Sequence, residues 1–73
     1  MTATKHEDLI LWEGPCAYAM KTGAGYGVYV FSTNSVTHVL AGTVAPDQAD
    51  RAEKLVRRLN AYPDKTRKFH GLL

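Results

Sequence analysis

Apolar and polar positions change from a two-residue alternation to a helical spacing near residue 45 of the chain. Residues 26–33 and 36–44 are rich in Tyr, Val, Phe and Thr, types that suit a pleated, half-buried surface, and they predict two strands. Residues 16–22 could be helix or strand by composition, but their length and the glycines beyond them favour a strand. The turn sequence Thr33-Asn34-Ser35 and the other short connections predict an antiparallel meander.

A shorter apolar run precedes these segments. Residues 9–12 read Leu-Ile-Leu-Trp and are closed by Glu13-Gly14-Pro15, in which glycine and proline favour a turn. This run predicts a brief strand or an anchoring segment, so the sheet has three strands or possibly four.

One amphipathic helix is predicted after residue 45. Pro46 suits the first helical position, and Pro63 predicts an end at or near Tyr62. The apolar stripe of this helix recurs at three- and four-residue spacing: Ala49, Ala52, Leu55, Val56, Leu59 and Tyr62.

Neither layer can bury its apolar face alone, so the helix is expected to pack across the sheet. The sequence therefore predicts one α+β domain over residues 1–73, a meander packed against one C-terminal α-helix in the order β-β-β-α. Residues 1–8 and 64–73 are expected to be flexible or docking tails.

The glycines of the stretch KTGAGYGVYV raise the possibility of a phosphate-binding loop. A dinucleotide-binding loop needs the spacing G-x-G-x-x-G before a helix, whereas Gly27 comes one residue early and a strand-like run follows it. We therefore expect Gly23 and Gly25 to supply positive φ for a hairpin. Gly27 is expected to mark a bulge or a close backbone contact.

Candidate catalytic and metal-binding groups are few. Cys16 is the only cysteine, and no base is evident beside it, so a buried structural thiol is favoured over a nucleophile. The histidines His6, His38 and His70 are spread along the chain without the spacing of a metal site. We therefore predict neither an enzyme nor a bound metal or cofactor.

Length and composition limit the class of protein. A chain of 73 residues forms a single core that supplies only about 3–5 kcal/mol, so a partner subunit would add useful stability. One cysteine argues against a disulfide-stabilised secreted domain. No apolar run approaches the roughly 20 residues of a membrane helix, and no signal peptide is evident. The prediction is a cytoplasmic protein without a membrane segment.

Basic residues are concentrated in the last third of the chain. Residues 51–73 contain seven Lys or Arg and two acidic residues, although the net charge of the whole chain is only +2. Such a region can be a solvated helix face or a contact for a polyanion. The candidate polyanion contacts are Arg51, Lys54, Arg58, Lys65, Arg67 and Lys68.

Aromatic residues are the other unusual feature of the predicted sheet. Alternation puts Tyr26, Val28 and Val30 on one face and Tyr29 and Phe31 on the other, so whichever face packs on the helix, the opposite one presents rings to solvent. Tyr and Trp are enriched at interface centres. The candidate protein interface comprises Tyr18, Tyr26, Tyr29 and Phe31.

The leading prediction is a small non-enzymatic binding module that contacts a second copy or another protein through the aromatic outer face of its sheet. The alternative is a nucleic-acid-binding module that uses the basic helix face and tail. The two predictions differ in their dependence on salt, because phosphate contacts weaken steeply as salt rises.

Overall fold

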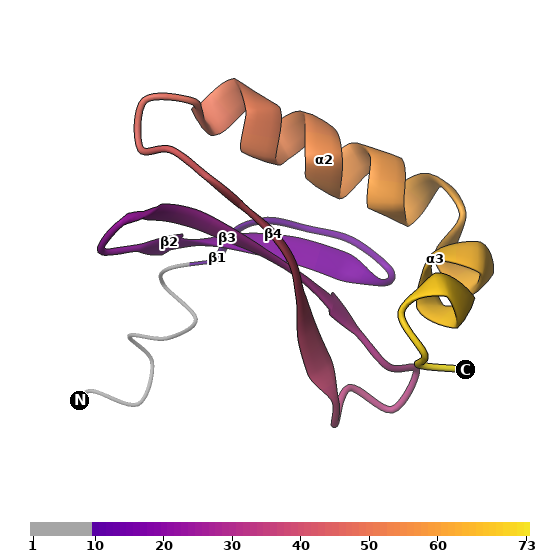
Figure 1. Ribbon diagram of the computed structural model, residues 1–73. Helices are drawn as coiled ribbons and strands as arrows, with labels where there is room; N and C mark the ends of the chain where they lie inside the picture. Colours follow the sequence, from indigo (N-terminus) through magenta and orange to yellow (C-terminus); the bar gives the residue numbers. More distant parts are fainter. Residues whose placement is uncertain (1–9) are drawn as a thin grey trace.

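A computed structural model describes residues 10–73 (Figure 1). The elements are β1 (Ile10–Glu13), β2 (Ala17–Thr22), β3 (Gly25–Phe31), β4 (His38–Val44), α2 (Ala49–Ala61) and α3 (Pro63–Phe69). The α+β prediction is confirmed, and residues 10–13 supply the fourth strand of the antiparallel sheet. The expectation of a flexible tail at residues 1–8 lies outside the described residues.

The strands follow one another in the order β1-β2-β3-β4, each pairing antiparallel with the next. An extra residue in β4, Ala41, interrupts the pairing between β3 and β4. Before it Leu40 pairs with Tyr29, and after it Gly42 pairs with Val28. Because of this bulge, Leu40 lies on the same face of the sheet as Tyr29, and Gly42 lies on the helix-facing side together with Val28.

The core lies between α2 and one face of the sheet (Figure 1). Its first cluster contains Ala19, Val28, Ala52 and Val56. A second cluster contains Cys16, Ala17 and Val30. Many of these side chains are small, which lets the helix approach the sheet closely but leaves a modest area of buried apolar surface.

The helix α2 begins at Ala49, three residues later than Pro46, so the predicted start is wrong. The backbone N–H of Gln48 donates to the carbonyl of Ala45 over 3.0 Å and closes a turn. The chain needs this turn because it must reverse direction between β4 and α2 (Figure 1). The helix ends at Ala61, next to the predicted end at Tyr62.

Residues 63–69, part of the segment expected to be a flexible or docking tail, form the short helix α3. Pro63 occupies its first turn, where a missing N–H costs nothing. Leu72, beyond this helix, packs against the second core cluster.

The glycine-rich turn between β2 and β3 is a hairpin, with Thr22 paired to Gly25. Gly25 has a φ of 141°, and a Cβ there would overlap the carbonyl oxygen of Val44. The expectation that Gly23 also has positive φ is wrong, because, of these two glycines, only Gly25 has a positive φ. The stretch therefore joins two strands and passes close to the end of β4.

Candidate functional site

Three of the four candidate interface rings gather on the sheet face opposite α2. Tyr18 pairs with Tyr29 across β2 and β3, and Phe31 pairs with His38 across β3 and β4. Leu40 lies beside Tyr29 on β4. We call Tyr18, Tyr29, Phe31, His38 and Leu40 the outer face. Within residues 10–73, α2 covers the opposite face (Figure 1), and the one helical side chain recorded against a ring of the outer face is Arg67 of α3, at Phe31.

Tyr26, the fourth candidate ring, lies on the other side of the sheet. It packs against the core cluster beneath α2, and its ring centroid is 6.0 Å from that of Trp12. Alternation along β3 accounts for this placement, because Tyr26 and Tyr29 are three positions apart, and side chains an odd number of positions apart point to opposite faces of a strand. Tyr26 is therefore a core residue and does not belong to the outer face.

The rings of the outer face form one connected cluster around Tyr18. The ring of Tyr18 stacks on Tyr29 at a centroid distance of 5.4 Å with an interplanar angle of 16°. Phe31 lies 6.0 Å and His38 5.6 Å from the same ring. Offset and tilted ring pairs of this kind add about 0.5–1.5 kcal/mol each beyond their area. The cluster is thus held in place by the fold itself.

Gly27 makes room for this cluster. The ring of Tyr29 lies only 3.0 Å from the position that a Cβ of residue 27 would occupy. The expected bulge at Gly27 is not found in the pairing of β2 with β3, where Met20 pairs with Gly27 in regular register. The close contact is made by an aromatic side chain that covers the bare backbone of the glycine.

A hydrogen-bond chain fixes the polar end of the cluster. The Nε2 atom of His38 lies 3.0 Å from the carbonyl oxygen of Ser35, which can only accept, so Nε2 carries the proton. In the neutral imidazole Nδ1 then accepts from the hydroxyl of Tyr18 over 2.9 Å. The hydroxyl of Tyr18 therefore has a protein partner and does not require water.

Exposure varies strongly across the outer face. Tyr18 is 8% exposed, whereas Leu40 is 55% exposed, and Tyr29 and Phe31 are half-buried. Burial raises the pKa of the Tyr18 hydroxyl above its ordinary value, and the neighbouring Tyr29 adds to the rise. The accessible part of the outer face therefore consists of His38, Leu40 and parts of Tyr29 and Phe31, above the buried ring of Tyr18.

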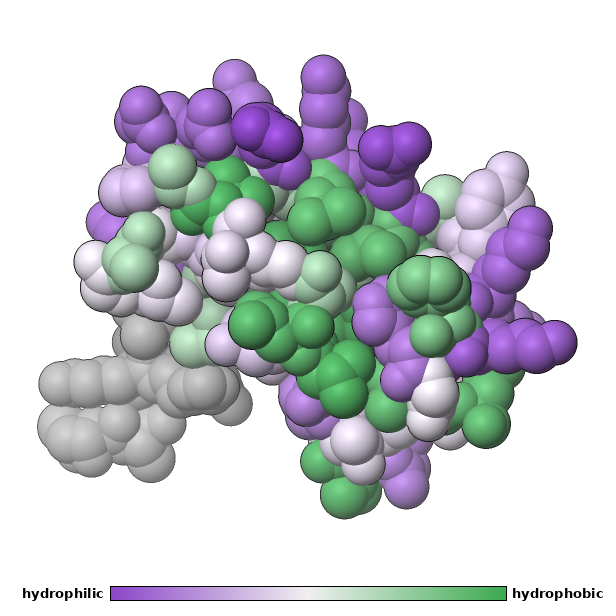
Figure 2. All heavy atoms as spheres, viewed as in Figure 1, coloured by the Kyte–Doolittle hydropathy of each residue, from purple (hydrophilic) through white to green (hydrophobic). Residues whose placement is uncertain are grey.

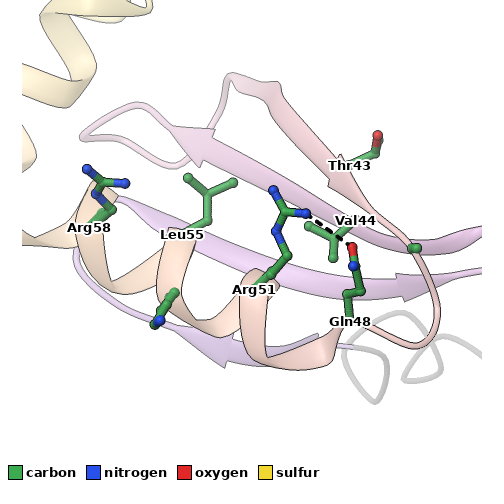
Figure 3. A pocket seen from close by; sticks show the side chains of 8 residues that line it. Thr43, Val44, Gln48, Arg51, Leu55 and Arg58 are labelled. Carbon is green, nitrogen blue, oxygen red and sulfur yellow. Dashed lines mark hydrogen bonds between the residues drawn. The ribbon is translucent and has the colours of Figure 1, made fainter.

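The candidate polyanion contacts are divided among different surroundings. Arg51, Lys54 and Arg58 line one groove of about 330 Å³ between α2 and the end of β4 (Figure 3). The guanidinium of Arg51 donates to the side-chain oxygen of Gln48 over 3.4 Å. Lys65 lines a neighbouring groove, and Lys68 is exposed on α3.

Arg67 is buried and is not a surface cation. Its Nε donates to the carbonyl of Phe31 over 2.9 Å, and a terminal nitrogen donates to the carbonyl of Pro15 over 2.6 Å. Its guanidinium carbon also lies 5.7 Å from the ring centroid of Phe31. Arg67 therefore ties α3 to the end of the sheet, which corrects its assignment as a polyanion contact.

The remaining candidate groups have structural partners. The thiol of Cys16 is fully buried and donates to the carbonyl of Leu59 over 3.1 Å. Burial raises the pKa of this thiol, and the smaller opposing effect of the Arg67 charge does not reverse the shift. His70 donates from Nδ1 to the carbonyl of Thr66 over 2.9 Å. His6 lies outside the described residues, and no three potential metal ligands cluster within residues 10–73.

Sequence reasoning missed Asn60, which joins the two layers. Its Oδ1 accepts from the backbone N–H groups of Cys16 and Ala17, each over 2.8 Å, and its Nδ2 donates to the carbonyl of Ala17 over 3.1 Å. One feature of the sequence indicates such a role. Asn60 comes four residues after Val56, which is buried, and this spacing puts its polar side chain on the helix face that meets the sheet.

No protein-family model matches the chain, and no match was found among curated proteins or among solved structures. Within residues 10–73, neither helix is both long enough and apolar enough to cross a membrane. Function must therefore be argued from the surfaces themselves.

Proposed function

We propose that this protein is a small non-enzymatic binding module whose outer face associates with the outer face of a second copy. The observation that carries the proposal is the one-sided placement of the helices, which leaves Tyr29, Phe31 and the 55% exposed Leu40 on the opposite side of the sheet. An exposed group of aromatic and aliphatic side chains over a rigid base has the features of an interface centre.

Charge favours a second copy as the partner. Among the described residues, those that register assigns to this side of β2, β3 and β4 are uncharged apart from the titratable ring of His38: Tyr18, Met20, Thr22, Gly25, Gly27, Tyr29, Phe31, His38, Leu40 and Thr43. The one acidic residue on this side is Glu13, which pairs with Tyr18 from the edge strand β1. Two such faces can therefore meet with little like-charge repulsion. A dimer formed through the helix side would instead bring like charges together, because Arg51, Lys54 and Arg58 of one copy would lie near the same residues of the other.

The size of the face limits the affinity. The four strands have 4, 6, 7 and 7 residues. At roughly 3.3 Å per residue and about 4.8 Å between strands, they give a face of about 380 Å². A standard stable interface buries about 800 Å² per partner, so the area supports a weak dimer with a dissociation constant in the micromolar range. We further place the module in the cytoplasm, where its single buried thiol needs no disulfide partner.

Sedimentation equilibrium over a concentration series tests the proposal. The wild-type protein is expected to shift from monomer to dimer within the micromolar range. Leu40→Lys is expected to remain monomeric, because it places a charge on the exposed aliphatic side chain of the outer face.

The matched control is Leu11→Lys, which introduces the same lysine at a leucine that is 45% exposed on β1. It is expected to dimerise like the wild type. A wild-type protein that stays monomeric throughout the series, or two variants that behave alike, contradicts the self-association proposal.

The nucleic-acid alternative has one supporting observation, the convergence of Arg51, Lys54 and Arg58 on a single groove. The burial of Arg67 removes one of its six proposed contacts. Three cations beside a strand edge suit the carboxylates of a protein as well as the phosphates of a nucleic acid.

A further inference from the structure

The strand β4 has an open edge. It is the last strand of the sheet and pairs with β3 on one side only within the described residues. Edge strands present N–H and C=O groups to solvent, and natural sheets often protect them with lysine, proline or very short strands. The sequence of β4, HVLAGTV, is seven residues long and contains no lysine or proline.

A two-part groove runs beside this edge. Next to Thr43 and Val44 it is lined by Arg51, Lys54 and Arg58, whose side chains project from α2 (Figure 3). Next to Ala41 it has a volume of about 490 Å³ and is lined mainly by apolar side chains, with two basic ones at its side: Leu55, Leu59, Tyr62, Lys65, Thr66, Phe69 and His70. Figure 2 shows this apolar surface gathered below the hydrophilic side chains of the helix. Leu55 lines both parts, so they lie next to each other along α2.

No carboxylate forms a salt bridge with the cations of the groove within the described residues. Among the residues that line its two parts, none is Asp or Glu. The one salt bridge within the described part of the chain, between Arg57 and Glu53, involves neither lining. An incoming anion would therefore meet three positive charges next to the edge of β4, none of which forms a salt bridge within residues 10–73.

We propose that the open edge of β4 binds an extended acidic segment of a partner protein as an added strand. The main-chain groups of the edge would pair with the partner backbone, as in β-strand addition. Acidic side chains would lie near Arg51, Lys54 and Arg58, and apolar side chains would enter the part lined by Leu55 and Leu59. This surface is separate from the outer face used for self-association.

Other occupants fit this edge less well. A second copy would place α2 beside its own counterpart and bring like charges together. A nucleic acid supplies phosphates for the cations but has no alternating amide groups for the strand edge, and phosphates gain nothing from the apolar part of the groove.

The bulge at Ala41 limits the length of the added strand. It leaves three-residue runs on either side, His38–Leu40 and Gly42–Val44, and the second run lies beside the cations. A short pairing of this kind supports micromolar rather than nanomolar affinity. In an antiparallel arrangement, the acidic half of the partner segment precedes its apolar half, because β4 runs from the apolar part toward the cations.

The test uses fluorescence anisotropy of the full-length protein with a labelled peptide of sequence Glu-Thr-Glu-Thr-Val-Thr-Leu-Thr. Binding is expected in the micromolar range. Replacement of both Glu by Gln in the peptide is expected to weaken binding about tenfold or more. N-methylation of alternate peptide nitrogens, which removes donors for the strand edge, is expected to do the same.

The protein variants separate the groove from general charge. Lys54→Gln combined with Arg58→Gln is expected to weaken binding about tenfold. Arg57→Gln is the control, because Arg57 is an exposed cation on the same helix that lies outside the groove. Circular dichroism checks that each variant is folded.

Three results would overturn the proposal. The first is no binding of the acidic peptide by the folded wild-type protein. The second is equal binding of the acidic, Gln-substituted and N-methylated peptides. The third is tighter binding of a single-stranded oligothymidylate than of the acidic peptide, which would assign the groove to nucleic acid.

Discussion

At the scale of single residues, Asn60 forms the strongest polar connection between helix and sheet. Replacing it with Ala leaves the backbone N–H groups of Cys16 and Ala17 without this acceptor, while the carbonyl of Ala17 keeps only its bond from the N–H of Gly14. We expect Asn60→Ala to lower the free energy of unfolding by about 2–4 kcal/mol, measured by urea denaturation. Asn60→Asp keeps the accepting oxygen and is expected to lose less. Equal stability of Asn60→Ala and wild type would show that the connection is dispensable.

Tyr18 predicts a dependence of stability on alkaline pH. Its folded-state pKa is raised, chiefly by burial, so the folded protein holds this proton at a pH where the unfolded chain has lost it. The stabilisation is complete below the unfolded pKa, roughly 10, and is lost as pH rises through the folded pKa. We expect the free energy of unfolding to fall less steeply above about pH 9 in Tyr18→Phe than in wild type. The pKa of Cys16 is also raised, but both proteins keep this thiol, so its effect on stability cancels in the comparison. Identical slopes of the free energy of unfolding against pH in the two proteins would contradict the prediction.

At the scale of elements, the attachment of α3 depends on a buried arginine. Arg67 donates to the carbonyls of Phe31 and Pro15 with two nitrogens of a planar fork, which a lysine cannot reproduce. We expect Arg67→Lys to lower the free energy of unfolding by about 1–3 kcal/mol and to speed hydrogen exchange in α3. Lys68→Arg, at the exposed neighbouring position, is the control and should change neither quantity. If neither the free energy of unfolding nor the hydrogen exchange of α3 changes in Arg67→Lys, the other contacts of this segment are sufficient to hold α3. These are the hydrogen bond from the Thr66 hydroxyl to the carbonyl of Leu59 and the packing of Leu72.

The elements also show which features a sequence pattern can predict. Alternation in β3 and the stripe of α2 depend on neighbours in the chain, so the strands, the helix and the ring-bearing face were accessible from the sequence. The pairing of Asn60 with Cys16 and of Arg67 with Pro15 joins positions more than forty residues apart, and no local pattern encodes it. The start of α2 was misplaced because a proline suits a turn before a helix as well as its first position.

At the scale of the whole molecule, the fold separates two surfaces of different chemistry. The outer face presents rings and Leu40 with few charges, and the groove along β4 presents cations and an unpaired strand edge. A small buried core gives this chain little stability to spare, so association on the outer face would also add to the stability of the fold. The Ala41 bulge serves both surfaces, because it directs Leu40 outward and shortens the open edge.

Residue-resolved NMR during dilution tests the central claim, self-association through the outer face, most directly. The amide signals of Tyr18, Tyr29, Phe31 and Leu40, and the ring signals of the three aromatic residues, are expected to shift as the protein is diluted from the millimolar to the low micromolar range, while the amide signals of α2 stay constant. Spectra that do not change with concentration, or that change along α2 and leave the outer face unaffected, would contradict the account.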